Sequence, residues 1–531
     1  MRRGYAALLI ALGSLVLVPQ AALAHGFGNR YDLPVPLGQY VAGAGAAVLL
    51  SFVLIGLFAK GVGGQSYPRF NLLRWRAGRA LAHPVVLQAL KVLSVAVFAI
   101  YLVAGLFGTD DPNDNLAPTL VWILFWVGLA YFSALVGNIW ALVNPWKVIF
   151  GWAEGVYRRV SGGAALSRNN PYPEGLDAWP AVALFFVFAW VENVYPDSAT
   201  PLHLAVFTLA YSGITLAGMF WYGKETWLRN GEIFSLAFGY LAMFAPTEVR
   251  VARAARAAGG GPALRASGRL VEGQVVVEQS RETARSEYRV DDYEAYSRAT
   301  AGAREWNVRP WAAGFLSPGA PSASHMLFIV LMLSTVTADG FTETPIWATV
   351  LTAGYNAIAG IAGFQAFTIV KTVGLVVVPL AFISAYAFTA WLMGKMARSD
   401  MSVVDVMRAF VYSLVPIALA YHIAHFFSFL AIQGQRIIPL ASDPLGRGWD
   451  LFGTAGYAID IGVVDAQAAW FVSVAAIVIG HVVAVYVAHV YATRLFRGGV
   501  ALRSQYPMLA LMVGYTMVSL WIIAQPIVET G

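Results

Sequence analysis

The stretch AFVYSLVPIALAYHIAHFFSFLAI (Ala409–Ile432) holds 24 residues without a single Asp, Glu, Lys or Arg. A helix needs roughly 20 mostly apolar residues to cross the hydrocarbon core of a bilayer, so this stretch predicts a membrane span. We expect further spans at nine other apolar stretches: Gln39–Phe58, Val85–Phe107, Leu120–Val143, Trp179–Val194, Leu202–Tyr222, Met326–Thr337, Phe367–Met393, Ala468–Tyr491 and Met508–Ile523. The sequence therefore predicts an all-α polytopic membrane protein with about ten spans.

The composition of the whole chain supports this class. Of the 531 residues, 58% are hydrophobic and only 12% are charged, and the mean hydropathy is +0.63. Soluble domains carry about a quarter charged residues, so the composition excludes an ordinary cytosolic enzyme, a disordered scaffold and a nucleic-acid binder. The chain contains no cysteine, which excludes disulfides, thiolate metal ligands, iron–sulfur clusters and cysteine nucleophiles.

The first 24 residues have the pattern of a secretory signal peptide. Arg2 and Arg3 precede the apolar stretch Tyr5–Val18, and Ala22-Leu23-Ala24 fits the small-x-small cleavage rule. We expect cleavage after Ala24, which makes His25 the first residue of the mature protein on the outer side of a bacterial inner membrane. An uncleaved signal that stays as a membrane anchor is the alternative.

Charged loops predict how the spans are oriented. The loop Lys60–Arg79 carries five basic residues, whereas Gly108–Pro118 carries three Asp and no Lys or Arg. The positive-inside rule then places both mature termini outside. This orientation requires that the short stretch Ile233–Ala245 is re-entrant or interfacial. The alternative is a full crossing there, compensated by an extra crossing at Ile346–Gly363.

The charged segment Glu248–Arg309 divides the chain into two membrane halves. We expect residues 25–247 to form a first half of about five spans with the re-entrant segment, and residues 322–531 to form a second half of five spans. Residues 248–321 then form a cytoplasmic linker, in which the alternating run Gly273–Gln279 predicts a strand. The sequence holds no phosphate-binding loop, HExxH or GxSxG motif, which disfavours nucleotide-driven transport and serine hydrolysis.

Histidines in the spans are candidate metal ligands. His422 and His425 are three residues apart in one predicted span, and His481 lies midway along the next span. Three imidazoles suit zinc or copper and leave a position open for water, and His25 offers its α-amine and ring as a further chelate. Two alternatives remain open: these histidines form hydrogen bonds between helices, or His481 holds a haem with His422 or His425.

Carboxylates on the predicted outer side are candidate catalytic residues. Glu192 lies at the end of a span, and Asp450 lies in the polar connection between the two histidine-bearing spans. A carboxylate at either position can act as a general base, and the Gly-rich connection resembles a lid over an outward-facing cavity. A solvated loop and ordinary surface carboxylates are the alternative interpretations.

Three motifs carry a resemblance to a known family: HGFGNRYDLPVP (His25–Pro36), YHIAH (Tyr421–His425) and DPLGRGWDLFG (Asp443–Gly453). The chain resembles bacterial membrane proteins labelled fenitrothion hydrolase, and the resemblance runs over nearly its whole length. It implies a membrane-bound hydrolase of organophosphorus triesters that works with a second membrane subunit. It assigns no catalytic residue.

Residues and resemblance together predict a hydrolase in which a metal-activated water attacks a lipophilic organophosphorus triester. The expected partners are the lipid bilayer, a lipophilic small molecule and the second subunit, with no nucleic acid. The alternative function is transport of a metal ion or solute through the same histidine cluster. A third function class, also open, is a membrane component of an electron-transfer assembly.

Overall fold

The computed structural model describes residues 30–58, 67–251, 304–316, 319–496 and 498–528. The signal peptide, His25 and the predicted strand Gly273–Gln279 lie outside these residues. Nine helices in the described part are long and apolar enough to cross a membrane. They are α2 (Leu37–Phe58), α4 (Pro84–Phe107), α5–η3–α6 (Leu116–Leu135), α10 (Pro201–Tyr222), α16 (Ala323–Thr342), α18 (Gln365–Ala397), α19–η6–α20–η7–α21 (Val403–Ser442), α22 (Ala466–Leu495) and α23–α24 (Gly498–Ile527). The fold is therefore an all-α polytopic bundle, as predicted.

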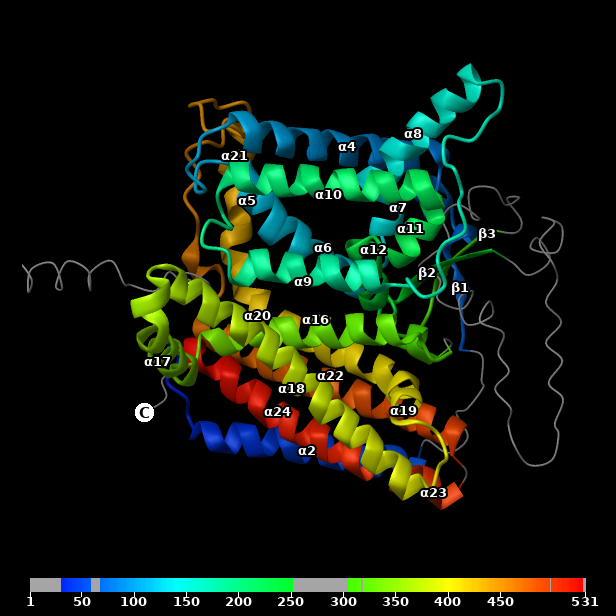
Figure 1. Ribbon diagram of the computed structural model, residues 1–531, viewed down its shortest axis with the longest axis vertical. Coiled ribbons are helices and arrows are strands. Elements are labelled where there is room, and N and C mark those ends of the chain that lie inside the picture. Colours follow the sequence, from blue (N-terminus) through cyan, green and yellow to red (C-terminus); the bar gives the residue numbers. More distant parts are fainter. Residues whose placement is uncertain (1–29, 59–66, 252–303, 317–318, 497, 529–531) are drawn as a thin grey trace, which may run out of the picture.

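The two ends of the bundle are structurally different (Figure 1). At one end, β1 (Phe70–Asn71), β3 (Arg304–Val308) and β2 (Thr247–Val251) form an antiparallel sheet in that order. At the other end, Tyr31 and Val528 form a parallel β-bridge, and Tyr31 N donates to Ile527 O at 2.9 Å. We call these the sheet end and the bridge end. Residues 248–251 of β2 and all of β3 belong to the predicted linker, so its first residues pair with a later part of it.

Polar caps and prolines set where several of the long helices begin. Ser322 caps α16, with its hydroxyl accepting from His325 N, and Asp465 caps α22 by accepting from Ala468 N. Such side chains satisfy backbone N–H groups that have no partner within the helix. Helices α4 and α10 begin with Pro84 and Pro201. Proline is favourable there because it lacks a backbone N–H, and the N–H groups of the first turn have no acceptor within the helix.

The predicted span Leu120–Val143 is interrupted in the structure. The helix ends at Leu135, and α7 (Trp140–Val143) is a separate short turn of helix. Thr247 of β2 contacts the chain at this break, where its hydroxyl donates to Val136 O at 2.5 Å and fills the space beside Gly137. A Cβ atom at Gly137 would overlap this hydroxyl oxygen.

The short segment α12 (Ile233–Leu241) does not have the length of a span. Its nine residues extend about 14 Å at 1.5 Å per residue, whereas the hydrocarbon core is about 30 Å thick. Eight of the nine residues are buried. Arg309, just after β3, donates to Ala242 O and Ala245 O at 3.0 Å, which ties the end of α12 to the sheet.

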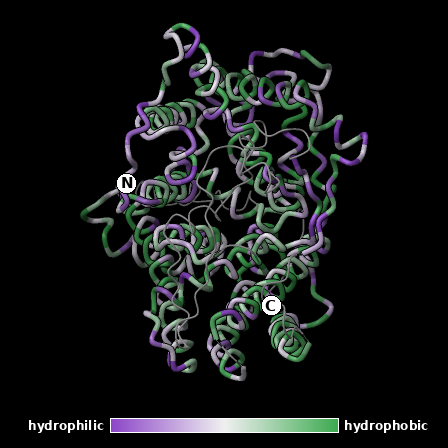
Figure 2. Tube along the Cα trace, turned by 90° about the vertical axis from the view of Figure 1, so that its right-hand side faces the viewer, coloured by the Kyte–Doolittle hydropathy of each residue, from purple (hydrophilic) through white to green (hydrophobic). Residues whose placement is uncertain are grey.

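Burial separates central helices from peripheral ones. In the most apolar stretch of each helix, 78% of residues in Val403–Ser442 and 67% in α16 are buried, against 17% in α4 and in α18. Hydrophobic residues also cover much of the perimeter when the bundle is viewed onto the sheet end (Figure 2), as expected for helices that face lipid. The helices α16 and α20 (Val415–Gln433) therefore form the interior, where the functional site is to be sought.

Two shorter helices complete the part of the bundle that positions the site. Helix α9 (Trp179–Asn193) is apolar and packs against α16. Helix α17 (Pro345–Ala362) lies at the bridge end against the start of α18 (Figure 1), where the rings of Tyr355 and Phe367 stack at 4.2 Å.

Candidate functional site

Four ionisable side chains gather near the bridge end of the bundle. His425 of α20 donates from Nε2 to Asp339 Oδ2 of α16 at 2.9 Å. Glu343, just after α16, interacts electrostatically with both of these residues. Glu192, near the end of α9, interacts electrostatically with Asp339. We call these four residues the acid–imidazole cluster.

Local structure explains why two of the carboxylates share this site. Asp339 and Glu343 are four residues apart, which places them on the same side of a helix one turn from each other. The chain turns immediately afterwards because Thr344 caps α17, with its hydroxyl accepting from Trp347 N at 3.2 Å. Glu343 therefore stays at the end of α16, facing the interior elements.

The members of the cluster differ in how exposed their side chains are. The side chain of His425 is only 4% exposed, whereas that of Asp339 is 28% exposed. Burial, opposed by His425 and reinforced by the negative charge of Asp339, raises the pKa of Glu343 to about 7. Glu343 thus changes its charge near neutral pH, beside an imidazole held by a carboxylate.

Glu192 was predicted as an outer-surface carboxylate, and it faces the cluster from α9. The indole of Trp126 donates a hydrogen bond to it. Trp126 belongs to η3 (Thr119–Gly128), a stretch of π-helix within the span Leu116–Leu135. Because π-helical turns shift side chains relative to an α-helix and are frequent at functional sites, this segment is part of the candidate site.

His422 lies one helical turn before His425 in a cage of aromatic rings. Its ring centroid is 5.8 Å from Trp126, 5.7 Å from Tyr131 and 4.8 Å from Phe426. The residue is 6% exposed, and neither ring nitrogen has a hydrogen-bond partner in the described part of the chain. Buried polar atoms normally have partners, so this imidazole is poised to meet a water molecule or another ligand.

His481 of α22 is engaged differently. Its Nδ1 donates to Ile477 O at 2.8 Å, and its ring lies 5.8 Å from that of Tyr515. Across the described ranges, no three His, Cys, Asp or Glu side chains form a group that could hold a metal ion. The zinc or copper site at His422, His425 and His481 stays a prediction, which the metal content of His422→Ala and His481→Ala proteins can test.

Asp450 lies in the exposed connection that follows α21 (Ile437–Ser442). Its Oδ1 accepts from Ala455 N at 3.0 Å, within the same connection. The connection is fastened to the loop after α4, where Arg447 donates to Phe107 O at 2.7 Å and Thr109 N donates to Leu445 O at 2.9 Å. Asp450 thus contacts its own loop, whereas Glu192 belongs to the acid–imidazole cluster. Catalytic roles for both residues stay predictions.

The prediction from sequence missed Asp339 and Glu343. A signal for them was present in TADGFTETP (Thr337–Pro345), where two carboxylates follow an apolar stretch at helical spacing. Ionisable residues at such depth are costly in a membrane and are functional candidates for that reason. The partner of Asp339 is 86 positions away in sequence, which no local pattern reveals.

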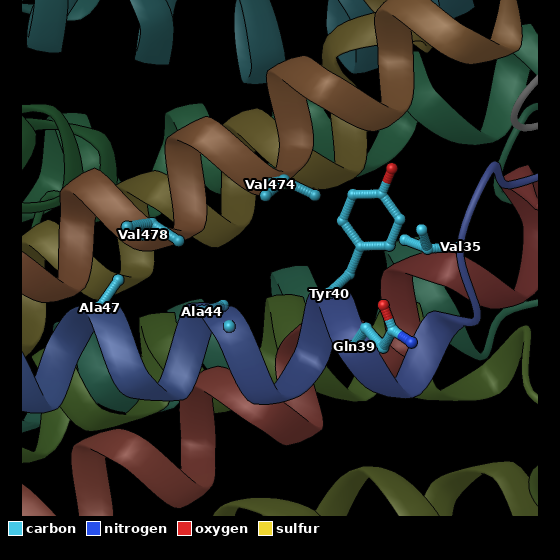
Figure 3. Close-up of a pocket in the computed structure, with 8 residues that line it drawn as sticks. Val35, Gln39, Tyr40, Ala44, Ala47, Val474 and Val478 are labelled. Atoms are coloured by element: carbon cyan, nitrogen blue, oxygen red, sulfur yellow. The ribbon is translucent and has the colours of Figure 1, made fainter.

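A groove of about 460 Å³ lies elsewhere on the bundle, between α2 and α22 (Figure 3). Tyr40 and Gln39 lie toward its bridge-end side, and the rest of its lining is apolar. Its remaining lining residues are Val35, Gly43, Ala44, Ala47, Val474 and Val478. The groove includes no member of the acid–imidazole cluster, so the cluster is the stronger candidate for chemistry.

Comparison with protein-family models, with curated proteins and with solved structures finds no match for this chain.

Proposed function

We propose that the acid–imidazole cluster binds and releases protons within the membrane, and that the protein couples this exchange to the transport of a solute. The observation that carries the proposal is the hydrogen bond between His425 and Asp339, with two further carboxylates within electrostatic range. Chains of Asp, Glu and His inside membrane proteins are typical of proton relays in pumps and transporters.

The proposed topology has ten crossings of a bacterial inner membrane. The pairing of Tyr31 with Val528 brings both ends of the described chain to the same side, which requires an even number of crossings. The nine long helices and the shorter α9 together give ten. Basic residues are abundant toward the sheet end, so the positive-inside rule makes this end cytoplasmic and the bridge end outer. These are Arg74, Arg76, Arg79, Arg158, Arg159, Lys395, Arg398, Arg494 and Arg503.

The exposure of Asp339 gives the proposed path of the proton. In this path the proton enters at Asp339, because its side chain is 28% exposed whereas that of His425 is 4% exposed. Protonation of Asp339 removes the negative charge that faces His425 across their 2.9 Å hydrogen bond. Glu343 changes its charge near neutral pH in the same site. Proton binding therefore alters the attraction between α16 and α20, the two central helices, and this supplies a coupling to movement.

The test is proton flux into liposomes that contain the purified protein and a pH-sensitive dye, driven by a potassium diffusion potential. We expect flux above that of protein-free liposomes, with fenitrothion added as a lipophilic solute probe in a parallel series. Asp339→Asn should reduce the flux at least tenfold. Asp405→Asn, a change at the exposed start of α19 (Val403–Phe410), is the matched control and should leave it unchanged. Equal flux in all three proteins contradicts the proposal.

Hydrolysis of an organophosphorus triester is the second candidate function. A carboxylate that orients an imidazole is the arrangement of a general base, and the side chain of Asp339 is partly exposed. In this reaction His425 accepts a proton from water, the water oxygen bonds to phosphorus, and the aryl oxygen leaves as a phenolate. The predicted metal ligands contact different partners, so this step is derived through His425 and Asp339 alone.

Measurements on a single preparation of the purified protein distinguish the two candidate functions. Release of the coloured nitrophenolate from fenitrothion without any gradient, and its loss in His425→Gln, supports the hydrolase. Proton flux that depends on Asp339 without phenolate release supports the transporter. The second membrane subunit implied by the resemblance is tested by whether co-purification with a partner from native membranes raises either activity.

A further inference from the structure

A second histidine–carboxylate pair lies at the end of α16 opposite to Asp339. His325, in the first turn of α16, has its Nδ1 2.6 Å from the hydroxyl of Tyr240 of α12. Its Nε2 faces Asp177 Oδ1 at 3.8 Å, and the side chains of His325 and Asp177 are 11% and 19% exposed. Asp177 precedes α9, which packs against α16. This group sits at the sheet end and plays no part in the acid–imidazole cluster.

The backbone around Asp177 shows that this position is held in place. Its φ is +35°, in the left-handed region that a residue other than glycine rarely adopts. Ser324 stabilises this conformation, because its hydroxyl donates to Asp177 Oδ2 at 2.8 Å and accepts from Ala178 N at 3.1 Å. Strain of this kind persists where surrounding contacts enforce it and is frequent at functional sites.

The two pairs are separated by a buried apolar section of α16. His325 and Asp339 are 14 positions apart, which corresponds to about 21 Å along a helix. Between them lie the buried apolar residues Met326, Phe328, Ile329, Val330, Leu331, Met332 and Leu333, followed near Asp339 by the buried hydroxyl residues Ser334, Thr335 and Thr337. The section Met326–Leu333 offers a proton no polar side chain, so the polar side chains of α16 fall into one group toward each end of the helix.

We propose that Asp177, His325 and Tyr240 form a second proton-exchange site that opens to the sheet end, so that α16 carries one proton site for each side of the membrane. The inference rests on the proposed proton exchange at the acid–imidazole cluster and extends it by naming the site of release. Two sites separated by an apolar barrier are what a transporter needs to exchange protons with each side in turn without a continuous leak.

The hydroxyl of Tyr240 donates a hydrogen bond to His325 before the proton binds and accepts one afterwards. In neutral His325 the Nε2–H faces the carboxylate of Asp177, and Nδ1 accepts from the Tyr240 hydroxyl. A proton from the aqueous side bonds to Nδ1, and Tyr240 then rotates its O–H away and accepts from the new N–H. The negative charge of Asp177 stabilises the imidazolium. Release to the sheet-end solvent reverses these steps, so no other reactant is needed.

The other ionisable groups on elements packed at this end of α16 do not replace Asp177. Arg408 of α19 pairs with Asp405 at 3.1 Å and donates to Pro321 O at 2.5 Å. Tyr386 of α18 donates to Met407 O at 2.6 Å. Toward this end these elements also carry Tyr412 of η6 (Val411–Leu414) and Lys395 of α18. Tyr172, which precedes Asp177 in the chain, donates to Asp177 O at 2.8 Å. Asp177 is the carboxylate that the structure pairs with the ring of His325.

The experiment follows the protonation of individual histidines when the pH is changed on one side only. The full chain carries 15N-histidine and is reconstituted in liposomes, from which one orientation is selected by a C-terminal affinity tag. NMR signals are assigned by their loss in His325→Gln and His425→Gln. We expect the His325 signal to titrate only with the pH on the sheet side. A His325 signal that is unmoved by pH on that side, or that follows the bridge side, overturns the inference.

The same experiment distinguishes failure of the proposed function from failure of this inference. A silent His425 with a titrating His325 contradicts proton exchange at the acid–imidazole cluster but keeps the sheet-end site. Tyr240→Phe gives the second readout, because it removes the hydroxyl that exchanges roles with His325. We expect it to shift the His325 titration by at least half a pH unit and to slow proton flux at least threefold. Tyr386→Phe, which removes another buried hydroxyl at the same end, should change neither; equal effects of the two variants contradict the inference.

Discussion

Gly480 of α22 packs directly on Ala420 of α20. A Cβ atom on the glycine would overlap the Cβ of Ala420 and lie 2.8 Å from Pro416 O. This close approach fixes the helix that carries His422 and His425 against the helix that carries His481, as small residues do between membrane helices.

Gly480→Ala should therefore force α20 and α22 apart. We expect a loss of about 1–3 kcal/mol in unfolding free energy, the usual cost of overpacking a filled interior, measured by thermal unfolding in detergent. Gly514→Ala is the control, because no neighbouring atom lies within 4 Å of its added Cβ. It should be neutral or slightly stabilising, since alanine favours helix more than glycine does. An equal loss in both variants would contradict the packing argument.

The hydrogen bond between Asp339 and His425 should appear as an energetic coupling. We expect Asp339→Asn and His425→Gln each to destabilise the protein, and the double variant to be less destabilised than the sum by about 0.5–3 kcal/mol, as for residues in direct contact. Chemical unfolding of the two single variants and the double variant gives this coupling. Pairing Asp339→Asn with Gly155→Ala, in α8 (Pro145–Val160) near the sheet end, should give additive effects.

Glu343 should make stability depend on pH. Burial raises its pKa to about 7 in the folded protein, above the ordinary value near 4.5. The folded state therefore binds the proton more tightly, so stability from this group is greatest below about pH 4.5, falls as the pH rises, and levels off above pH 7. The full difference is about 3 kcal/mol for a shift of this size. Glu343→Gln should remove this loss, giving a higher melting temperature than wild type at pH 8 and little difference at pH 4.5.

Glu232 should be the most sensitive carboxylate for the first half of the bundle. It is fully buried and caps α12 by accepting from Phe234 N and Ser235 N. It also accepts from the side chains of Trp140, Asn144, Tyr211 and Ser235. Glu232→Ala leaves these donors without an acceptor and should cost about 3–5 kcal/mol, as for other buried networks that lose a charged partner. Glu154→Ala, at a partly exposed ion pair with Lys224, should cost under about 1 kcal/mol.

Glu248 holds the sheet end together through arginines. It contacts Arg309 at 2.8 Å and Arg69 at 2.6 Å, and is 7% exposed. Burial opposes its ionisation, but Arg309, Arg69 and Arg250 outweigh burial and hold the pKa of Glu248 below its ordinary value. Its contribution to stability is therefore present above about pH 4.5 and is lost as the pH falls through the lower folded value. Glu248→Gln should flatten the acid side of a stability profile measured between pH 3 and pH 6.

The sequence predicted the spans well because the requirement for them is local. Twenty apolar residues identify a helix such as α22 without knowledge of its neighbours. The break after Leu135 was missed; Val136 O there accepts from Thr247, on a strand more than a hundred positions away, and no local pattern reveals such a contact. The stretch Ile233–Ala245 forms the nine-residue helix α12, which is not among the helices long enough to cross a membrane.

The candidate site was predictable only in part. His425 was identified by its residue type inside an apolar stretch, but its partner Asp339 was not, because the pair forms only when α16 packs against α20. The histidines were expected to act together on a metal ion, whereas the structure gives His422, His425 and His481 three different surroundings. Side-chain partners between helices are set by tertiary packing, which the period of a single helix does not encode.

The pairing of Tyr31 with Val528 makes the described chain nearly a closed loop. Helix α2 lies against both α22 and α24, so the first and last spans seal the bundle as neighbours in space. A short linker between these two ends, with new termini opened in an exposed connection such as the one that contains Asp450, would keep every helix contact in place. We therefore expect the final arrangement of the spans to be independent of the order in which they are synthesised.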